Sequence, residues 1–309
     1  MQILGDADLD RLVPMKDAVK VIEEGLRAHG EGNLVAPPRH WVKFAHGSLG
    51  FTIGGCDVDG GSVGFRVYSV FEGGAESDTQ ATLVFDSRTG GLKGAVFGDR
   101  LGIVRTGAIG GVALKYLANR SSERIGVLGS GPQAWAQLEG AMTQLPIRRV
   151  RVFSPTREHR GEFAQRAATT FSVDAKAVET PRKAVDDSEV VICSTTSATP
   201  VLESGWVHPG LHITTMGRKT KTHHEIDVGV AEKAVVLATD SLAQIRAYSE
   251  PHLLEGTPSW NRILELSDIV TGKSRGRINA AQVTLFLSTG IAGTEVLLAA
   301  EALRRAVAH

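Results

Sequence analysis

The sequence has little of several features that would place a protein in a specialised class. It contains two cysteines, Cys56 and Cys193, which are too few for a disulfide framework or a cysteine-based zinc site, so we expect a reducing, cytoplasmic setting. Lysine plus arginine and aspartate plus glutamate each number 34, and this balance argues against the basic surface that nucleic-acid binding requires. The longest uncharged stretch, residues 278–294, is short and polar for a membrane span, and the acidic first ten residues do not resemble a signal peptide. We expect a soluble protein with neither a nucleic-acid nor a membrane partner.

The remaining composition is that of a globular protein. Hydrophobic residues make up 42% and charged residues 22% of the chain, close to the usual values. The 35 glycines, against only 6% aromatic residues, are typical of α/β sheets with tight turns. At roughly 150 residues per domain, 309 residues predict two domains.

The first 118 residues alternate short strands with glycine-rich turns. Apolar residues at helical spacing predict a helix from Met15 to Leu26, and a second helix is predicted over Thr106–Ala118. Between them the pattern predicts an antiparallel sheet with strands at Val42–Phe44, Gly50–Ile53, Gly64–Val70, Ala81–Asp86 and Leu92–Phe97.

From Ser121 onward, strands alternate with helices or loops. This rhythm predicts an α/β fold with a doubly wound parallel sheet of the Rossmann type. A final helical stripe is expected to return to the first domain, which is then discontinuous: residues 1–118 with 292–309, against 119–291 for the Rossmann domain. The predicted strands are Arg124–Leu128, Arg149–Phe153, Glu189–Cys193, His212–Met216 and Ala234–Ala238, and the helices between the first of them are Gln133–Met142 and Arg157–Ala168.

A glycine-rich turn joins the first of these strands to its helix, with the sequence Gly129-Ser130-Gly131-Pro132-Gln133-Ala134. Two glycines at a strand-to-helix turn allow the backbone to approach a pyrophosphate, which then sits at the helix N-terminus. Ala134 is an accepted small replacement for the third glycine of the dinucleotide fingerprint. The motif alone would also fit a plain tight turn, but its strand and helix context predicts dinucleotide binding.

The end of the next strand indicates which dinucleotide is bound. NAD enzymes usually carry an acidic residue there for the ribose hydroxyls, whereas this strand is followed by Ser154, Pro155, Thr156 and Arg157. Hydroxyls and a guanidinium suit a 2′-phosphate, so NADP(H) is favoured over NAD(H). The alternative is that Arg157 is a solvated residue of the next helix.

An ordered set of short motifs resembles the ornithine cyclodeaminase/mu-crystallin family over nearly the whole chain. The most specific piece runs from Arg105-Thr106-Gly107-Ala108 through Lys115-Tyr116-Leu117-Ala118 to the glycine loop. Supporting pieces are Pro37-Pro38-Arg39, Pro209-Gly210-Leu211-His212, Met216-Gly217, Glu225-Ile226-Asp227 and Ser288-Thr289-Gly290-Ile291-Ala292. The resemblance implies a Rossmann domain, a substrate-binding domain that also forms a homodimer, and chemistry on a small amino or imino acid.

The resemblance also implies which residues bind the substrate. Arg39 and Arg105 match family arginines that bind the substrate carboxylate, for which a guanidinium offers a bidentate fork. Arg66 stands where the family has an active-site lysine. It can bind a carboxylate, but its high pKa makes it a poor proton donor, so Tyr68 or a water would have to replace the lysine. The alternative is a non-catalytic arginine in a remodelled site.

Glu295 matches a family aspartate on the helix after the Ser288 segment, where it activates water or holds the amino group. We expect Glu295 to steer the substrate nitrogen. The alternative is an acidic residue that is simply favourable near a helix N-terminus. Two family residues are thus replaced, the lysine by Arg66 and the aspartate by Glu295. These replacements indicate a specialised member of the family and weaken the case for true ornithine cyclodeamination.

Several other residues lie where the predicted sheet ends. Thr195 and Thr196 follow one strand and Met216-Gly217 another, at the carboxyl edge where ligands bind, so we expect them near the cofactor. The Lys219–Lys221 run is expected to be a solvated loop, and Cys193 to be inert core. The pair His223-His224 does not fit a metal site, because adjacent residues rarely face one ion. For Asp78 and Gln80 a substrate role and an exposed turn are both open.

Three functions fit these residues. The first is an NAD(P)-dependent oxidoreductase that reduces a small imino acid or oxidises the matching amino acid. The second is a deaminating lyase that recycles bound NAD(P). The third is a non-catalytic NADPH-binding protein of the crystallin kind, which the arginine at position 66 keeps open.

Overall fold

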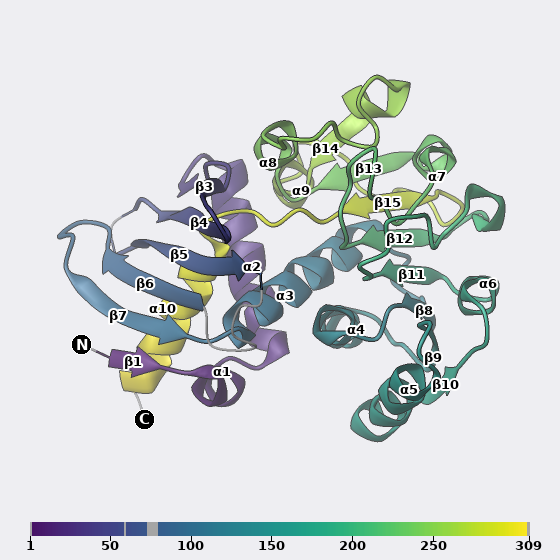
Figure 1. Cartoon of the computed structure of the whole chain (residues 1–309), viewed down its shortest axis with the longest axis horizontal. Coiled ribbons are helices and arrows are strands. Elements are labelled where there is room, and N and C mark those ends of the chain that lie inside the picture. The colour runs from purple at the N-terminus through teal and green to yellow at the C-terminus, as the bar shows by residue number, and fades with distance from the viewer. Residues whose placement is uncertain (1, 59, 73–79, 308–309) are drawn as a thin grey trace. The chain divides into compact units, whose positions relative to one another are not determined.

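The computed structural model describes residues 2–58, 60–72 and 80–307 (Figure 1). Two compact units make up the chain, one formed by residues 1–108 and 290–309 and the other by residues 109–289. Helix α3 (Arg100–Leu117) contains the first boundary, and the second follows Thr289, whereas the sequence analysis placed the boundaries after Ala118 and Ile291.

The first unit is an α+β arrangement built on a seven-stranded sheet. Only β1 pairs in parallel with its neighbour β7, and the other pairings are antiparallel. The strand order is β1 (Gln2–Leu4), β7 (Leu92–Phe97), β6 (Gln80–Asp86), β5 (Ser62–Phe71), β4 (Gly47–Cys56) and β2 (Leu34–Val35), with β3 (His40–Phe44) paired to β4.

One face of this sheet is covered by the C-terminal helix. Helix α10 (Thr294–Val307) crosses strands β4 to β7 and packs against α2 (Met15–Gly30) and α1 (Asp6–Leu12) (Figure 1). Gly25 of α2 allows this close approach, since a Cβ there would lie 2.5 Å from a methyl group of Leu297. Helix α10 is therefore part of the first unit.

The second unit contains an eight-stranded sheet in which every pairing is parallel. The fold is therefore α/β, with a doubly wound sheet of the Rossmann type. Its order is β10 (Asp174–Ala177), β9 (Arg149–Phe153), β8 (Arg124–Leu128), β11 (Val190–Cys193), β12 (His212–Thr215), β15 (Thr284–Leu287), β13 (Val236–Thr239) and β14 (Ile263–Glu265). The helices are α4 (Pro132–Gln144), α5 (Arg157–Phe171), α6 (Pro181–Val185), α7 (Val228–Lys233), α8 (Leu242–Arg246) and α9 (Leu266–Val270).

Burial explains why the strands of the second unit are short and apolar. Every residue of β11, β12, β13 and β15 is buried, as expected for a parallel sheet covered on both faces. Cys193 is fully buried at the end of β11, and burial raises the pKa of its thiol well above the usual value, which confirms it as inert core.

The structure agrees with most of the predicted elements and shifts some of their ends. The strands Arg124–Leu128, Arg149–Phe153 and Leu92–Phe97 have the predicted bounds. Helix α3 begins at Arg100 rather than at Thr106. Strands β1, β2, β10, β14 and β15 were not predicted from the sequence. Within the described residues, no helix combines the length and apolar character that a bilayer span needs.

Candidate functional site

A buried cluster of charges occupies the first unit. Glu295, in the first turn of α10, pairs with Arg66 of β5 through Nη1 at 3.2 Å and with Arg105 of α3 through Nη2 at 3.0 Å. The three residues are 1%, 8% and 6% exposed, respectively. Three elements far apart in the sequence therefore meet at one carboxylate.

The alternation of β5 explains why Arg66 points into the unit. Arg66 is registered opposite Thr52 of β4 and Thr82 of β6, which are also buried, so all three lie on the face that α10 covers. Gly102 of α3 leaves space for the guanidinium, since a Cβ there would lie 2.6 Å from Arg66 Nη2.

Arg39 completes the cluster from the segment between β2 and β3. A Cβ added to Gly290 would lie 2.8 Å from Arg105 Nη1 and 3.1 Å from Arg39 Nη2, so both guanidiniums lie against this glycine. Gly290 has φ +84°, which also favours glycine. Gly290, which belongs to the Ser288–Ala292 motif, therefore leaves space for the guanidiniums of Arg39 and Arg105.

The arginines of the cluster keep Glu295 ionised. Burial by itself raises the pKa of Glu295. The combined effect of Arg105, Arg66 and smaller contributions outweighs burial, so the net pKa of Glu295 is lowered. Two guanidiniums thus pair with one ionised carboxylate, and Arg39 adds a smaller effect that also lowers its pKa. Nε and Nη1 of Arg105 are buried without a hydrogen-bond partner within the described residues. Buried donors of this kind indicate a site for an anion that is itself a good acceptor.

Two further residues border the arginines. The ring of Tyr68 lies 4.8 Å from the guanidinium carbon of Arg66 and packs edge-on against Trp41. Gln80 accepts a hydrogen bond from Arg66 Nη2, so Gln80 belongs to the cluster rather than to an exposed turn. Asp78 lies outside the described residues.

The structure gives Glu295 well-defined partners. Its Oε1 contacts both arginines, and Oε2 accepts a hydrogen bond of 3.4 Å from Thr294 Oγ1. Its lowered pKa makes it an acceptor and not a proton donor at neutral pH. Glu295 therefore orients the arginines, while its expected contact with a substrate nitrogen stays a prediction.

The glycine loop of the second unit has the shape that a dinucleotide requires. Gly129 has φ +114°, and a Cβ there would lie 2.0 Å from Ser194 O, so no other residue fits. Around Gly131 a Cβ would meet nothing within 4 Å, which leaves open space at the start of α4, where Pro132 is the first helical residue. Gln133 Oε1 is a buried acceptor with no hydrogen-bond partner among the described residues. The geometry of Gly129 and the open space at Gly131 fit a pyrophosphate at the helix N-terminus, whereas the acceptor Gln133 Oε1 is not suited to bind an anion.

The end of β9 carries hydroxyls and arginines instead of a carboxylate. Ser130 donates to Ser154 Oγ at 3.0 Å, and Ser154 donates to Thr156 O at 3.2 Å. Thr156 is the N-cap of α5, and Arg157 follows it as an exposed residue. Arg160, which sequence reasoning did not single out, is buried and holds the turn by donating to Ser154 O at 2.8 Å.

The carboxyl ends of β11 and β12 lie side by side, because these strands pair in register up to Cys193 and Thr215. Thr195 and Met216-Gly217 therefore follow the same edge of the sheet, and Thr196 is exposed beside them. Both ends contact Glu225, which sequence reasoning quoted only as part of a motif.

The expectation that Lys219–Lys221 is a solvated loop was wrong for Lys219. Its side chain is buried, with the residue 3% exposed, because isolated bridges join Lys219 to His224 and Thr220 to His252. Nothing in the local sequence predicts the contact with His252. No group of three or more His, Cys, Asp or Glu that could hold a metal ion occurs within the described ranges.

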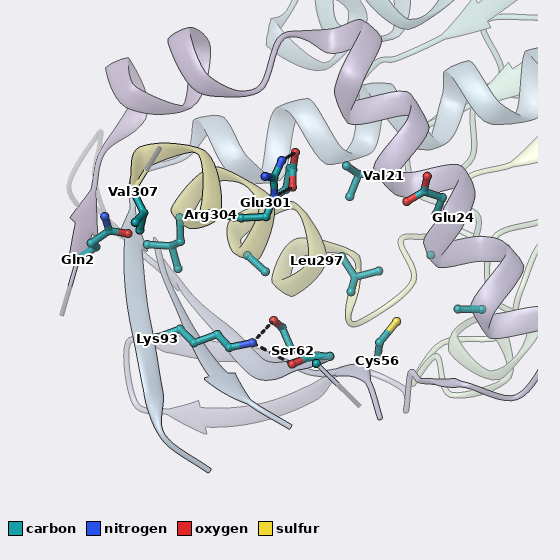
Figure 2. Close-up of a pocket in the computed structure, with 16 residues that line it drawn as sticks. Gln2, Val21, Glu24, Cys56, Ser62, Lys93, Leu297, Glu301, Arg304 and Val307 are labelled. Atoms are coloured by element: carbon teal, nitrogen blue, oxygen red, sulfur yellow. Dashed lines mark hydrogen bonds and ion pairs between the residues drawn. The ribbon is translucent and has the colours of Figure 1, made fainter. Parts of the chain in front are cut away.

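A cavity of about 850 Å³ lies elsewhere in the first unit, lined by α2, α10 and the beginnings of β5 and β7 (Figure 2). Lys93 donates to Ser62 Oγ at 3.0 Å, and Glu301 pairs with Arg304 at 2.7 Å. None of the clustered arginines lines it. Lys93, Glu301 and Arg304 pair with neighbouring groups, and the lining shares no residue with the arginine cluster, so this cavity is distinct from it.

The sequence profile of the ornithine cyclodeaminase/mu-crystallin family matches residues 2–307. The chain belongs to this family. The predicted resemblance is thereby confirmed.

Relatives of known structure or activity extend the comparison. The structure of Δ1-pyrroline-2-carboxylate reductase from Thermococcus litoralis, in complex with NADH and L-proline, is 28% identical with a TM-score of 0.91, covering 100% of this chain and 98% of the other. An archaeal alanine dehydrogenase dimer with bound NAD is 25% identical with a TM-score of 0.87, covering 99% and 96%. Δ1-Pyrroline-2-carboxylate reductase of Bacillus cereus is 25% identical over 316 residues, 99% of this chain and 97% of that protein.

Replacement of Glu295 tests the charge cluster directly. Glu295→Gln removes the negative charge between Arg66 and Arg105 and leaves two buried guanidiniums facing each other. We expect the free energy of unfolding, measured with urea, to fall by about 3 to 5 kcal/mol, and sulfate to restore part of the loss by supplying an anion. The control is Glu301→Gln on the same helix, whose pairs with Arg304 and Arg305 lie at the surface and should contribute less than about 1 kcal/mol. Equal losses in the two variants would contradict a buried charge cluster.

Proposed function

We propose that this protein is an NAD(P)-dependent reductase of a small imino acid that also oxidises the matching amino acid. The observation that carries the proposal is the buried pairing of Arg66 and Arg105 with Glu295, with the half-buried Arg39 beside Arg105 at Gly290 and with buried donors of Arg105 for an anion. A carboxylate matches the geometry and charge of such donors. The pyrroline-2-carboxylate reductases and alanine dehydrogenase among its relatives support this chemistry.

In this proposal each unit has its own task. The second unit binds the dinucleotide on Gly129–Gly131, and a reduced nicotinamide supplies the hydride for the imine carbon. In the first unit, Arg105, Arg66 and Arg39 bind the substrate carboxylate. Glu295 keeps the guanidiniums oriented and offsets part of their mutual repulsion. Since Arg66 is a poor proton donor, the proton that reaches the imine nitrogen comes from another group or from water.

The test is a cofactor-oxidation assay with a cyclic α-imino acid and with keto acids plus amines. We expect the wild-type protein to oxidise reduced cofactor only when an imine is present. Arg105→Met should raise the KM for the imino acid by roughly 10- to 100-fold, because a charge-assisted hydrogen bond contributes about 1.5 to 3 kcal/mol. Arg100→Met on the same helix, where Arg100 pairs with Asp10, should leave the KM unchanged. Ammonia release without net cofactor consumption would favour the deaminating lyase, and no turnover with any pair would favour a binding protein.

We also propose that the preferred cofactor is NADP(H). The end of β9 lacks a carboxylate at Ser154–Arg157, and Arg157 is exposed in the first turn of α5, which suits a 2′-phosphate.

Arg157→Ala tests this preference. We expect it to raise the KM for NADPH about 10-fold and to leave the KM for NADH unchanged, because only NADPH carries the 2′-phosphate. Arg166→Ala, an exposed arginine on the same helix that stacks on Trp135, should alter neither value. The preference for NADP(H) is wrong if the wild type shows equal KM values, or if Arg157→Ala affects both cofactors alike.

We further propose a homodimer formed through the face of the first sheet that α10 does not cover. On this face the register places Ile53 beside Phe65, and Phe65 beside Leu83. Phe65 also stacks with Phe85 at 6.5 Å, and Ile53 is 54% exposed. A continuous apolar sheet face favours a large protein partner, and the archaeal alanine dehydrogenase of the same fold is a dimer.

Light scattering after size exclusion tests the dimer. The chain mass is 32.9 kDa, so we expect about twice that mass for the wild type. Ile53→Lys places a charge on the apolar face and should give the monomer mass. Ile278→Lys, at an apolar residue of the second unit that is 63% exposed, should remain dimeric. A wild-type monomer, or a dimer that survives Ile53→Lys, would exclude this interface.

A further inference from the structure

One buried carboxylate joins the ends of two neighbouring strands in the second unit. Glu225 is 1% exposed. Its Oε1 accepts hydrogen bonds from Thr195 N at 2.6 Å and Thr195 Oγ1 at 2.8 Å, directly after β11. Its Oε2 accepts hydrogen bonds from Met216 N at 3.0 Å and Gly217 N at 2.6 Å, directly after β12. A single side chain thus fixes both segments relative to each other.

The peptide groups of Gly217 are held on both sides. Its N–H donates to Glu225, and its C=O accepts a hydrogen bond of 2.7 Å from Lys219 Nζ. A Cβ at Gly217 would lie 2.6 Å from Glu225 Cδ and 2.8 Å from Thr195 O, so only glycine fits. Burial lowers the pKa of Lys219 to about 8, against the opposing effect of Glu225 and Asp240.

The position of these segments in the sheet gives the arrangement a functional meaning. The strand order is β9-β8-β11-β12, and the pyrophosphate loop follows β8. In a doubly wound fold the dinucleotide lies across the carboxyl edge, with the adenosine half on the side of the second strand, here β9. The nicotinamide half then lies on the other side, where the ends of β11 and β12 meet Glu225.

We infer that Glu225 is a positioning residue for the nicotinamide half of the cofactor, acting through Thr195, Met216 and Gly217, with Lys219 as a second anchor on the same segment. This inference rests on the proposed function. Hydride transfer is sensitive to small displacements of the reacting groups, and a 1 Å error can cost about 100-fold in rate. A backbone segment fixed at both its N–H and its C=O groups meets that requirement.

The test compares the binding of NADPH with the binding of 2′-phospho-ADP-ribose, which lacks the nicotinamide. Glu225→Gln replaces one acceptor oxygen with an amide NH₂ that faces backbone N–H groups, so either the Thr195 or the Gly217 segment has to move. We expect the Kd for NADPH, measured by calorimetry, to rise at least 10-fold and kcat to fall about 100-fold. The Kd for 2′-phospho-ADP-ribose, which lacks the nicotinamide, should change less than 2-fold.

Asp227→Asn is the matched control. Asp227 caps α7 by accepting from Val230 N at 3.1 Å and also accepts from Ser204 N at 2.7 Å. The Asp227→Asn variant should have a lower Tm, but the ratio of the Kd for NADPH to the Kd for 2′-phospho-ADP-ribose should not change. A purely structural role for Glu225 predicts that Glu225→Gln behaves like Asp227→Asn, or weakens both ligands equally, and either result overturns the inference.

A milder pair of variants keeps the test decisive if Glu225→Gln does not fold. Thr195→Val removes the hydroxyl that donates to Glu225 and accepts from Ser197 N at 3.3 Å. It should weaken NADPH binding about 3-fold without affecting 2′-phospho-ADP-ribose, while Thr195→Ser, which keeps the hydroxyl, restores the wild-type ratio. Equal effects on both ligands overturn the inference. Failure of the wild type to bind either NADPH or NADH refutes the proposed function as well. Normal wild-type binding and turnover, together with a Glu225→Gln variant that behaves like the wild type, refutes only the positioning role.

Discussion

The arrangement of the first unit depends on the ionised carboxylate of Glu295. Buried guanidiniums repel one another and are costly to remove from water, so Arg66 and Arg105 can share a small volume only with a fixed negative charge between them. Glu295 supplies that charge from the first turn of α10, where a carboxylate is also favoured by the helix N-terminus. Glu295 Oε1 contacts two guanidiniums, and Nε and Nη1 of Arg105 are still buried without a hydrogen-bond partner among the described residues. These two donors are the basis on which we propose an anion site.

The second unit uses buried carboxylates differently. Glu225 accepts from backbone N–H groups and a hydroxyl, and Asp240 accepts from Thr289 N at 2.8 Å and Thr289 Oγ1 at 2.6 Å. These acceptors fix the ends of strands without creating a positively charged site. The two units thus place buried acids for different purposes, one to hold Arg66 and Arg105 close together and the other to fix the backbone at the edge of a sheet.

The sequence predicted the regular elements and the separate site residues better than the contacts between them. Short apolar strands such as Arg124–Leu128 are visible from local pattern, and the family motifs identified Arg39, Arg66, Arg105 and Glu295. The pairing of Glu295 with Arg66 joins positions 229 residues apart, and no local pattern encodes it. Lys219 was expected in solvent because Lys-Thr-Lys is polar, yet the bridge between Thr220 and His252 carries it into the interior.

Arginine at position 66 makes contacts that a lysine could not make together. Its Nη1 binds Glu295, its Nη2 binds Gln80, and its flat face lies 4.8 Å from the centre of the Tyr68 ring. A lysine ammonium is a compact point charge without a planar fork, and it would have to give up some of these contacts. The same change removes a group that can exchange a proton near neutral pH. Arginine therefore gives up acid–base capacity for a more rigid set of contacts with Glu295, Gln80 and Tyr68. Under the proposed function, this loss suits reduction of an imine that is already formed better than a sequence of proton transfers around a deamination.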